Sequence, residues 1–308
     1  MKKYFAGLFF GMIFFIFPPA HAAQSNQISI IFAGDIMLDR SVYLATLADQ
    51  KNYEHPFLLI APELAKYDLR IANLEGPITN TTFDLARSKK MSFTFNPKFA
   101  PAIAKNFDIV SLANNHTYNF GEAGLLSTKN YLHTAGTEYF ADPLNRAGYT
   151  TRIIEKNNFK IAVVGYHAFA GPEKKNIPVI IAAIKDAKMH ADAVIVMPHW
   201  GVEYAAKPSS AQIAAGHAFI DAGADAVIGG HPHVIEPMET YKGKPIYYSL
   251  GNFIFDQFFS RATMQGELVN VVVMRDESGA IKITTKPITY EINKKAQPFM
   301  TPAVALLP

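Results

Sequence analysis

AVIGGHPHVIEP, residues 226–237, is an apolar run that stops at two glycines and then places His231 and His233 on either side of a proline. Taken alone, the two histidines fit either a pair of metal ligands or a turn whose imidazoles bond to backbone carbonyls. The apolar part is typical of a strand in a sheet that is covered on both faces. Similar runs recur along the chain, so the stretch predicts an α/β fold in which functional side chains follow the strands.

Apolar runs alternate with helical segments through most of the chain, as expected of an α/β fold. Strands are expected at residues 28–35, 68–75, 107–116, 160–169, 192–201 and 225–233. Helices are expected at residues 96–106, 121–136, 178–190 and 209–223. A hairpin with an Asn-Asn turn is predicted over 152–165, and closing antiparallel strands over 245–255 and 266–292. Because no repeat or linker interrupts this pattern, residues 23–308 are expected to form a single domain.

Residues 1–22 have the pattern of a signal peptide. Two lysines precede a 14-residue apolar stretch, two prolines end that stretch, and Ala20-His21-Ala22 supplies the small residues that signal peptidase requires. The apolar stretch is short for a membrane span, which needs about 20 residues. We therefore expect cleavage near Ala22, export to the periplasm or the cell exterior, and no stable membrane span in the mature chain. An uncleaved N-terminal anchor is the alternative.

Charge and cysteine content exclude several functions. Without the two lysines of the signal peptide, 27 basic and 26 acidic residues remain, which gives a net charge of +1. No cationic run follows, so nucleic acid is not an expected partner. The chain has no cysteine. A metal site must therefore use nitrogen and oxygen ligands, which argues against thiolate zinc and iron–sulfur chemistry.

Five of the apolar runs end in small residues followed at once by side chains that can bind a metal. In an open α/β sheet such ends gather at one edge, because helices return the chain to the same side each time. The residues in question are Asp35, Glu75, Asn115 with His116, His199, and His231 with His233.

Each of these residues also has a structural explanation. Asp35 could cap the helix that follows it, and Glu75 could be a solvated turn residue. Asn115 and His116 could form a turn rich in asparagine, and His199 could be a buried histidine beside Trp200. Five equivalent strand ends are harder to explain in this way than one. The other histidines lack the pattern and are left out of the predicted site: His55, His133, His167, His190 and His217.

The chemistry that fits these residues is hydrolysis by two metal ions. A shared carboxylate would bridge two divalent ions, which would activate a water for attack on a phosphoryl centre. Neutral imidazoles and an Asn carbonyl would complete the ligand sets. His116, next to Asn115, is placed to protonate the leaving oxygen.

The ordered motifs GDIMLDR, ANLEGPIT, LANNHTYNFGEAGL, PHWGVEY, GGHPHVIEP and YSLGNFIFDQ resemble those of the CapA-like proteins of poly-γ-glutamate capsule synthesis. That family in turn resembles the calcineurin-like metallophosphoesterases. The resemblance covers residues 28–256 and implies a four-layer α/β/β/α sandwich. It also implies two divalent ions, of Mn, Fe, Zn or Mg.

Residue roles are carried over from the same resemblance. One ion would be held by Asp35, Glu75 and His233. The other ion would be held by Glu75, Asn115, His199 and His231, with His116 as proton donor. Arg40, Glu203 and Asn252 lie in the shared motifs and are expected to touch the substrate.

Two departures concern the first ion. The Asp-x-His motif of the phosphoesterases is Asp35-Ile36-Met37 in this chain, so one ligand is missing. The bridging Asp is Glu75, which is one methylene longer.

Two functions are compatible with these features. The first is an exported, metal-dependent hydrolase that acts on poly-γ-glutamate or another cell-envelope polymer. The second is a non-catalytic accessory protein that binds an anionic polymer through bound metal and assists capsule synthesis or export. The presence of six ligand positions and of His116 favours the hydrolase, since an accessory protein would be free to lose some of them. The sequence does not define the oligomeric state.

Overall fold

The computed structural model describes Met1, residues 26–170 and residues 173–301. The predicted signal peptide therefore lies, apart from Met1, outside the described residues. Within the described part of the chain, no helix has both the length and the apolar character needed to cross a membrane.

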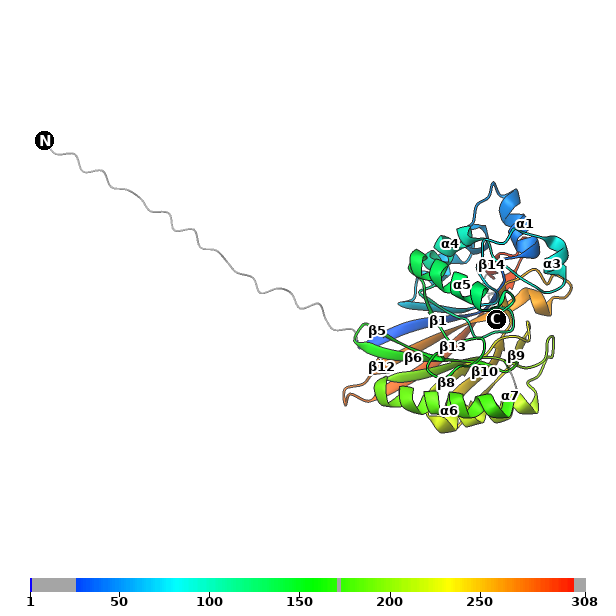
Figure 1. The fold of residues 1–308 in the computed structure, drawn as a ribbon. Helices are drawn as coiled ribbons and strands as arrows, with labels where there is room; N and C mark the ends of the chain where they lie inside the picture. Colours follow the sequence, from blue (N-terminus) through cyan, green and yellow to red (C-terminus); the bar gives the residue numbers. More distant parts are fainter. Residues whose placement is uncertain (2–25, 171–172, 302–308) are drawn as a thin grey trace, which may run out of the picture.

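Two sheets form the centre of the molecule (Figure 1). The first sheet has the strand order β14-β13-β12-β1-β2-β3-β4. β12 pairs with the first part of β1, and β11 pairs with the last two residues of β1. Its strands are β1 (Gln27–Ile36), β2 (Leu69–Leu74), β3 (Ile109–Ser111), β4 (Glu138–Phe140), β11 (Asn252–Ile254), β12 (Gln265–Arg275), β13 (Ile281–Ile292) and β14 (Pro298–Met300). β1 to β4 run parallel to one another, so their carboxyl ends share one edge.

The second sheet has the strand order β5-β6-β7-β8-β10-β9. Its strands are β5 (Thr151–Lys156), β6 (Phe159–His167), β7 (Ala193–His199), β8 (Ala226–Ile228), β9 (Ile235–Tyr241) and β10 (Lys244–Leu250). β6, β7, β8 and β10 are parallel, whereas the two outer strands are antiparallel to their neighbours. Its parallel strands therefore also end at a common edge.

Helices cover the outer face of each sheet, which gives the four layers α/β/β/α (Figure 1). On the first sheet lie α1 (Arg40–Ala48), α2 (Ala61–Leu64), α3 (Leu85–Lys89), α4 (Ala100–Asn106) and α5 (Gly121–Ala135), with the 3-10 helices His55–Phe57 and Pro97–Phe99. On the second sheet lie α6 (Glu173–His190) and α7 (Ser210–Ala222). A third 3-10 helix, Ala262–Met264, precedes β12. The fold is therefore the sandwich that the family resemblance implies.

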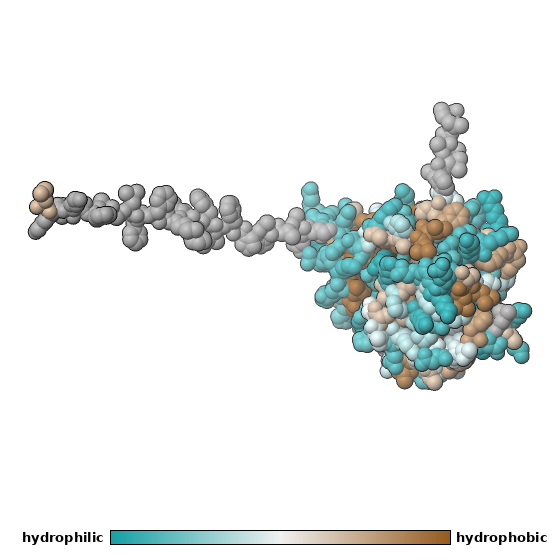
Figure 2. Space-filling model, turned by 90° about the horizontal axis from the view of Figure 1, so that it is seen from above, coloured by the Kyte–Doolittle hydropathy of each residue, from teal (hydrophilic) through white to brown (hydrophobic). Residues whose placement is uncertain are grey.

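The core follows these layers. Apolar side chains of both sheets meet in a central layer, for example Phe32 and Ile71 of the first sheet and Ile161 and Ile195 of the second. Two further layers lie between each sheet and its helices. Burial on both faces explains why the strands read as nearly continuous apolar runs. On the face shown in Figure 2, apolar residues lie in separate areas among hydrophilic ones.

Several elements differ from the sequence prediction. α6 begins at Glu173 and contains Pro178, whereas the sequence placed the start at the proline, the usual residue of a first turn. β9 was not predicted, because Pro237 and alternating polar residues weaken the strand pattern; both are tolerated on the edge strand that β9 forms. The prediction of antiparallel strands over 245–255 is correct for the pairing of β10 with β9 and wrong for the other two pairings. β11 runs parallel to β1, and β10 runs parallel to β8.

Candidate metal centre

Asp35 lies at the carboxyl end of β1 and is fully buried. Its Oδ1 accepts a hydrogen bond from Asn73 Nδ2 at 2.8 Å, and its Oδ2 accepts one from the backbone N–H of His231 at 3.0 Å. Burial raises the pKa of Asp35 to about 6, although the two hydrogen bonds act in the opposite direction and lower it. Asp39, and not Asp35, caps α1. The helix-capping explanation for Asp35 is therefore excluded.

Glu75 follows β2 and is also fully buried. Neither carboxylate oxygen has a hydrogen-bond partner among the residues that the structure describes. Oε1 lies 3.7 Å from His233 Nε2, 3.9 Å from His116 Nε2 and 4.0 Å from His199 Nε2. Burial, and then the charge of Asp35, raise the pKa of Glu75 well above its usual value. An unpartnered carboxylate among imidazole nitrogens is costly unless a cation binds there, so the residues fit a metal ion.

His199 ends β7 and contacts two other predicted ligands. Asn115 Oδ1 is 2.9 Å from His199 Nε2, and His231 Nδ1 is 3.2 Å from the same atom. Separations of this size are those of neighbouring ligand atoms at a metal centre, because metal–ligand bonds of about 2.1 Å place neighbouring ligands roughly 3 Å apart. The loops after β3, β7 and β8 therefore converge as the strand-end argument predicted.

His231 and His233 occupy a loop with an unusual backbone. Their φ angles are 97° and 59°, and such positive values are uncommon for residues other than glycine. Gly230 precedes them because a Cβ at that position would lie 2.7 Å from Asp35 Oδ1. Strained backbone of this kind clusters at functional sites, where the surrounding structure enforces it.

Asn252 orients the ring of His233. The Asn252 Nδ2 group donates to Gln257 Oε1 and to the Thr263 carbonyl, both at 3.0 Å, which turns Oδ1 towards the ring. His233 Nδ1 donates to this Oδ1 at 2.9 Å, so Nε2 keeps its lone pair for a metal. Asn252 is itself fully buried behind the histidine. Its contact with substrate stays a prediction, and its contact with His233 supports a positioning role.

The histidines of the site are neutral at pH 7. Burial is the main cause in every case, and neighbouring histidines add to it for all but His167. The pKa falls to about 4 for His116, His167 and His231, to about 3 for His233, and well below the usual value for His199. Neutral imidazole is the form that binds metal ions.

His116 lies at the rim of this group, against the ring of Phe93 at a centroid separation of 4.3 Å. Asn119 Oδ1 accepts a hydrogen bond from the backbone N–H of Phe93, and it also lies 3.2 Å from His116 Nδ1. Nδ1 therefore carries the proton, and Nε2 points its lone pair towards Glu75. This nitrogen is placed to take up or deliver a proton beside the carboxylate.

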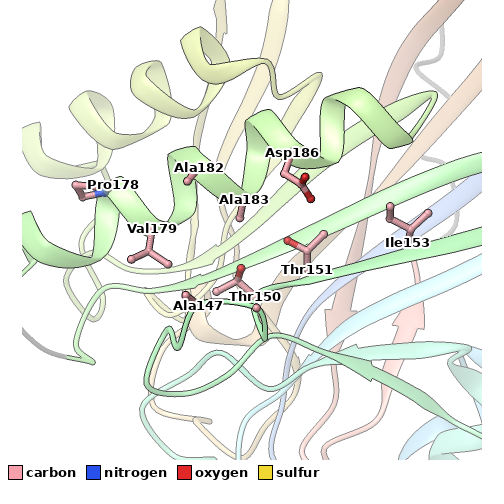
Figure 3. Close-up of a pocket in the computed structure, with 10 residues that line it drawn as sticks. Ala147, Thr150, Thr151, Ile153, Pro178, Val179, Ala182, Ala183 and Asp186 are labelled. Atoms are coloured by element: carbon pink, nitrogen blue, oxygen red, sulfur yellow. The ribbon is translucent and has the colours of Figure 1, made fainter.

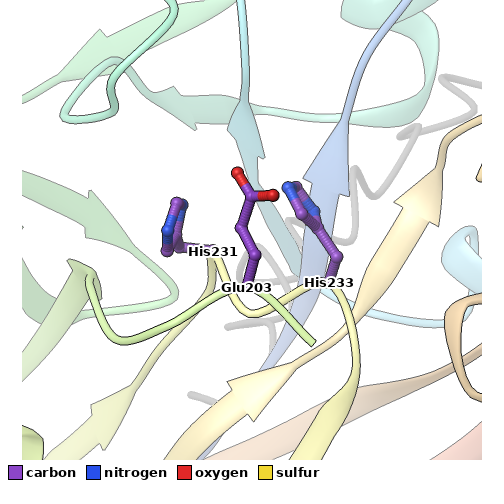
Figure 4. Close-up of side chains that lie close together, drawn as sticks. All are labelled: Glu203, His231 and His233. Carbon is purple, nitrogen blue, oxygen red and sulfur yellow. The ribbon is translucent and has the colours of Figure 1, made fainter. Parts of the chain in front are cut away.

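The described residues contain two groups of three side chains that could each hold a metal ion. Within each group, the three ligand atoms lie within 4.8 Å of one another. One group is Asp35, Glu75 and His199, and the other is Glu203, His231 and His233. Figure 4 shows the Glu203 carboxylate between the two histidine rings. The family resemblance assigns these two histidines to different ions, whereas the structure groups them with Glu203. The division of ligands between ions stays a prediction.

Arg40 supplies positive charge near the carboxylates. Its guanidinium binds Asp256 at 2.5 Å and lies over the rings of Phe93 and Phe255, 4.9 and 5.4 Å from their centroids. The charge of Arg40 lowers the pKa of Glu75, although burial has the larger and opposite effect. Asp256 and the two rings hold the guanidinium in place beside the carboxylates, and its contact with substrate stays a prediction.

His167, which the sequence analysis left out, lies at the same edge. It is the register partner of His199, and the two rings are 6.2 Å apart. Nδ1 donates to the Pro143 carbonyl at 2.6 Å, while the buried Nε2 has no hydrogen-bond partner in the described part of the chain. The signal was present in the sequence, because an apolar run ends at His167 as another ends at His199.

A cavity of about 700 Å³ lies elsewhere, between α6 and the segment that enters β5 (Figure 3). Its lining is mostly apolar and includes Ala147, Ile153, Val179 and Ala183. None of the predicted site residues lines it. The chemistry is therefore expected at the strand ends and not in this cavity.

The four layers and the buried cluster of carboxylates and histidines define a protein of the metallophosphoesterase fold class. A family model described as "Bacterial capsule synthesis protein PGA_cap" matches residues 29–257. The chain belongs to this family, which confirms the resemblance seen in the motifs.

Relatives and solved structures agree with this assignment. The PGA biosynthesis protein CapA of Bacillus subtilis (strain 168) is 32% identical over 285 residues, covering 87% of this chain and 73% of the relative. A protein of Mycobacterium tuberculosis (strain H37Rv) named "probable polyglutamine synthesis accessory protein" is 26% identical over 295 residues, covering 76% of each chain. The crystal structure of a hypothetical protein from Thermus thermophilus has a TM-score of 0.51 at 18% identity, covering 86% of this chain and 99% of the other. That likeness supports the fold.

Proposed function

We propose that this protein is an exported, metal-dependent hydrolase that cleaves a bond in poly-γ-glutamate or another anionic cell-envelope polymer. Membership of the capsule-synthesis family supports the polymer, and the ligand cluster supports the metal dependence. The signal-peptide pattern of residues 1–22 supports export. Two divalent ions are proposed, since six predicted ligand positions converge at the strand ends.

One observation carries this proposal: Glu75 is fully buried with both oxygens unpartnered among the described residues, and imidazole nitrogens surround it. A fold without a metal would have little reason to keep this arrangement. A protonated carboxyl at this position would be buried without a hydrogen bond, and an ionised one would be buried without a counter-charge. Both states lower the stability of the fold. A bound divalent cation would supply the partner that the ionised carboxylate of Glu75 lacks.

The residues of the chain divide the chemical work. Asp35, Glu75 and the neutral histidines would hold divalent ions, which activate water and polarise the bond to be cleaved. Arg40 would bind an anionic group of the polymer and hold the chain against the site. His116 Nε2, which carries no proton in the neutral ring, would accept the proton released when water is activated and pass it to the leaving atom, with Nδ1 held by Asn119.

The test uses purified mature protein and two measurements. Bound metal is determined after dialysis against manganese, iron or zinc, and hydrolysis is assayed with phosphoester and γ-glutamyl substrates. We expect bound metal and turnover in the wild type. His116→Ala should keep the metal and lower kcat by about 10²–10⁴-fold, the usual contribution of a general acid or base. A protein that binds none of these metals would overturn the proposal.

A second function has support from a relative's name and from the open side of the site. The Mycobacterium tuberculosis relative is named an accessory protein of polymer synthesis, and Glu203 leaves part of the cluster exposed to solvent. A protein of this kind would bind the anionic polymer through its metal without cleaving it. Metal-dependent binding of poly-γ-glutamate with no turnover of phosphoester or γ-glutamyl bonds would identify it.

A further inference from the structure

We propose that Glu203 is a metal ligand, which together with His231 and His233 forms an open three-ligand site on the solvent side of the centre. This inference rests on the proposed function, because it concerns the metal ions of the same site. It assigns to Glu203 a role that differs from the substrate contact implied by the family resemblance. It also supplies a carboxylate ligand at the centre where the first motif of this chain lacks a histidine.

The geometry of the three side chains carries the assignment. One ligand atom from each of Glu203, His231 and His233 lies within 4.8 Å of the other two. The carboxylate reaches between the two rings from the loop that follows β7 (Figure 4). Ligand atoms of one ion lie roughly 3–4 Å apart. Small side-chain movements would therefore allow all three atoms to bind the same ion.

The histidines are prepared for this ligation by their other contacts. His233 Nδ1 donates to Asn252 Oδ1, which leaves Nε2 as the coordinating atom. The backbone N–H of His231 donates to Asp35 Oδ2 at 3.0 Å, so a hydrogen bond to Asp35 holds the loop that carries both histidines. The ring hydrogen bond of His233 is of the type that fixes ring orientation at metal sites and raises ligand basicity, whereas the backbone hydrogen bond of His231 positions its loop.

Met37 follows Asp35 by two positions, where the family resemblance implies a metal-binding histidine. Its side chain is fully buried, and its sulfur accepts a hydrogen bond from the backbone N–H of Asp39 at 3.1 Å. The sulfur is therefore engaged in shaping the turn before α1. A carboxylate from the opposite loop can complete a ligand set that this position leaves incomplete.

The charges around Glu203 agree with a cation. Glu75 Oε1 lies 3.7 Å from His233 Nε2, and Asp35 Oδ2 lies 3.5 Å from His233 Nδ1. Together with Glu203, three carboxylates therefore lie around the ring of His233. Two histidines and one carboxylate with an open position are the ligand set of catalytic zinc and of non-haem iron sites. The outer ion would be the one that meets solvent and substrate.

The test compares Glu203→Gln with wild type, using zinc as the probe. Glu277→Gln, which changes an exposed glutamate in the turn between β12 and β13, is the matched control. Zinc per chain is measured by mass spectrometry after equilibrium dialysis, and affinity by calorimetry. We expect Glu203→Gln to bind one zinc ion fewer, or to bind it at least about tenfold more weakly, since even outer-shell partners contribute that much.

A spectroscopic measurement adds a readout that does not depend on turnover. With manganese, two coupled ions should give a broadened spin-coupled signal in wild type and in Glu277→Gln. The signal of Glu203→Gln should change to the six-line pattern of an isolated manganese ion. Far-UV circular dichroism and melting of the metal-free protein check that the variant is folded.

The outcomes separate this inference from the proposed function. Unchanged zinc stoichiometry and affinity in Glu203→Gln would overturn the ligand assignment and leave the metal-dependent hydrolase standing. A wild-type protein that binds no zinc, manganese or iron would overturn both. Loss of zinc in Glu277→Gln to the same extent would also count against the assignment, because the effect would then be one of surface charge.

Discussion

At the scale of single residues, the decisive feature is a carboxylate that folding alone does not explain. Glu75 is buried beside Asp35, and the charge of Asp35 makes ionisation of Glu75 less favourable, because like charges repel strongly where water is excluded. Proteins retain such groups where function requires them. A buried acid without a partner is thus a point where stability and function oppose each other.

Glu75→Gln should separate these two effects. The amide has nearly the same shape and no charge, and it can donate to the lone pairs of nearby imidazoles. Without metal, we expect the free energy of unfolding at pH 8 to rise by about 1–3 kcal/mol. Zinc should stabilise the wild type and should stabilise the variant much less, because a predicted metal ligand is lost. Urea unfolding with EDTA and with zinc measures both effects. A metal-free variant less stable than wild type would contradict the account.

Much of the site could be predicted from the sequence, because strand ends in a parallel sheet converge regardless of their separation along the chain. Asp35, Glu75 and His199 were identified in this way, and all three lie together. The position of Glu203 against two histidine rings could not be predicted, because it depends on the path of a loop. His167 was predictable on the same grounds, since it ends β6 as His199 ends β7.

At the scale of elements, glycines set how closely the strand ends approach one another. A Cβ on Gly34 would lie 2.0 Å from the carbonyl oxygen of Gly251, so β1 and the segment before β11 touch through their backbones. A Cβ on Gly230 would instead meet the carboxylate of Asp35 at 2.7 Å. The first contact is between two backbones and the second involves a side chain. The two positions therefore differ in what a methyl group would displace.

Alanine at these positions should give different defects. Gly34→Ala must separate two strands, and we expect a loss of about 1–3 kcal/mol of unfolding free energy, as for other overpacked sites. Gly230→Ala can be accommodated by moving Asp35, so we expect a smaller loss of stability and at least about tenfold weaker zinc binding. Chemical unfolding of the metal-free proteins and zinc calorimetry provide the comparison. Equal losses of stability in both variants would show that Asp35 is not free to move.

The elements themselves were predictable where burial dominates. β1, β2, β6 and β7 are apolar along most of their length because layers cover both faces, and the sequence identified all four. Pairing of the late strands was less accessible, because apolar pattern does not specify direction. β11 pairs with β1 in parallel only because the chain crosses between the two sheets after β10.

At the scale of the whole molecule, the sandwich buries many titratable groups together in one region. Five histidines have a lowered pKa there, and Asp35 and Glu75 have a raised one. In the unfolded chain the histidines would titrate at about 6.5 and the acids at about 4. The folded and unfolded states therefore bind different numbers of protons at mildly acidic pH, and stability must depend on pH.

The sign of this dependence follows from which groups are more numerous. As pH falls from about 6.5 to about 4, the unfolded chain protonates histidines that stay neutral in the fold, so stability is lost. One histidine whose pKa falls from 6.5 to about 4, such as His231, corresponds to roughly 3 kcal/mol. The two acids act in the opposite direction, because the fold keeps protons on them that the unfolded chain releases. Five histidines against two acids give a net loss on acidification.

We therefore expect the metal-free protein to lose melting temperature steadily between about pH 6.5 and about pH 4.5. Metal-bound protein should fall more steeply over the same range, because bound ions require neutral imidazoles and ionised carboxylates and are released by acid. Calorimetric melting with EDTA and with zinc measures both curves. His231→Gln should flatten the metal-free curve, with the exposed His190→Gln as control. A metal-free melting temperature that stays constant or rises on acidification would show that the buried acids outweigh the histidines.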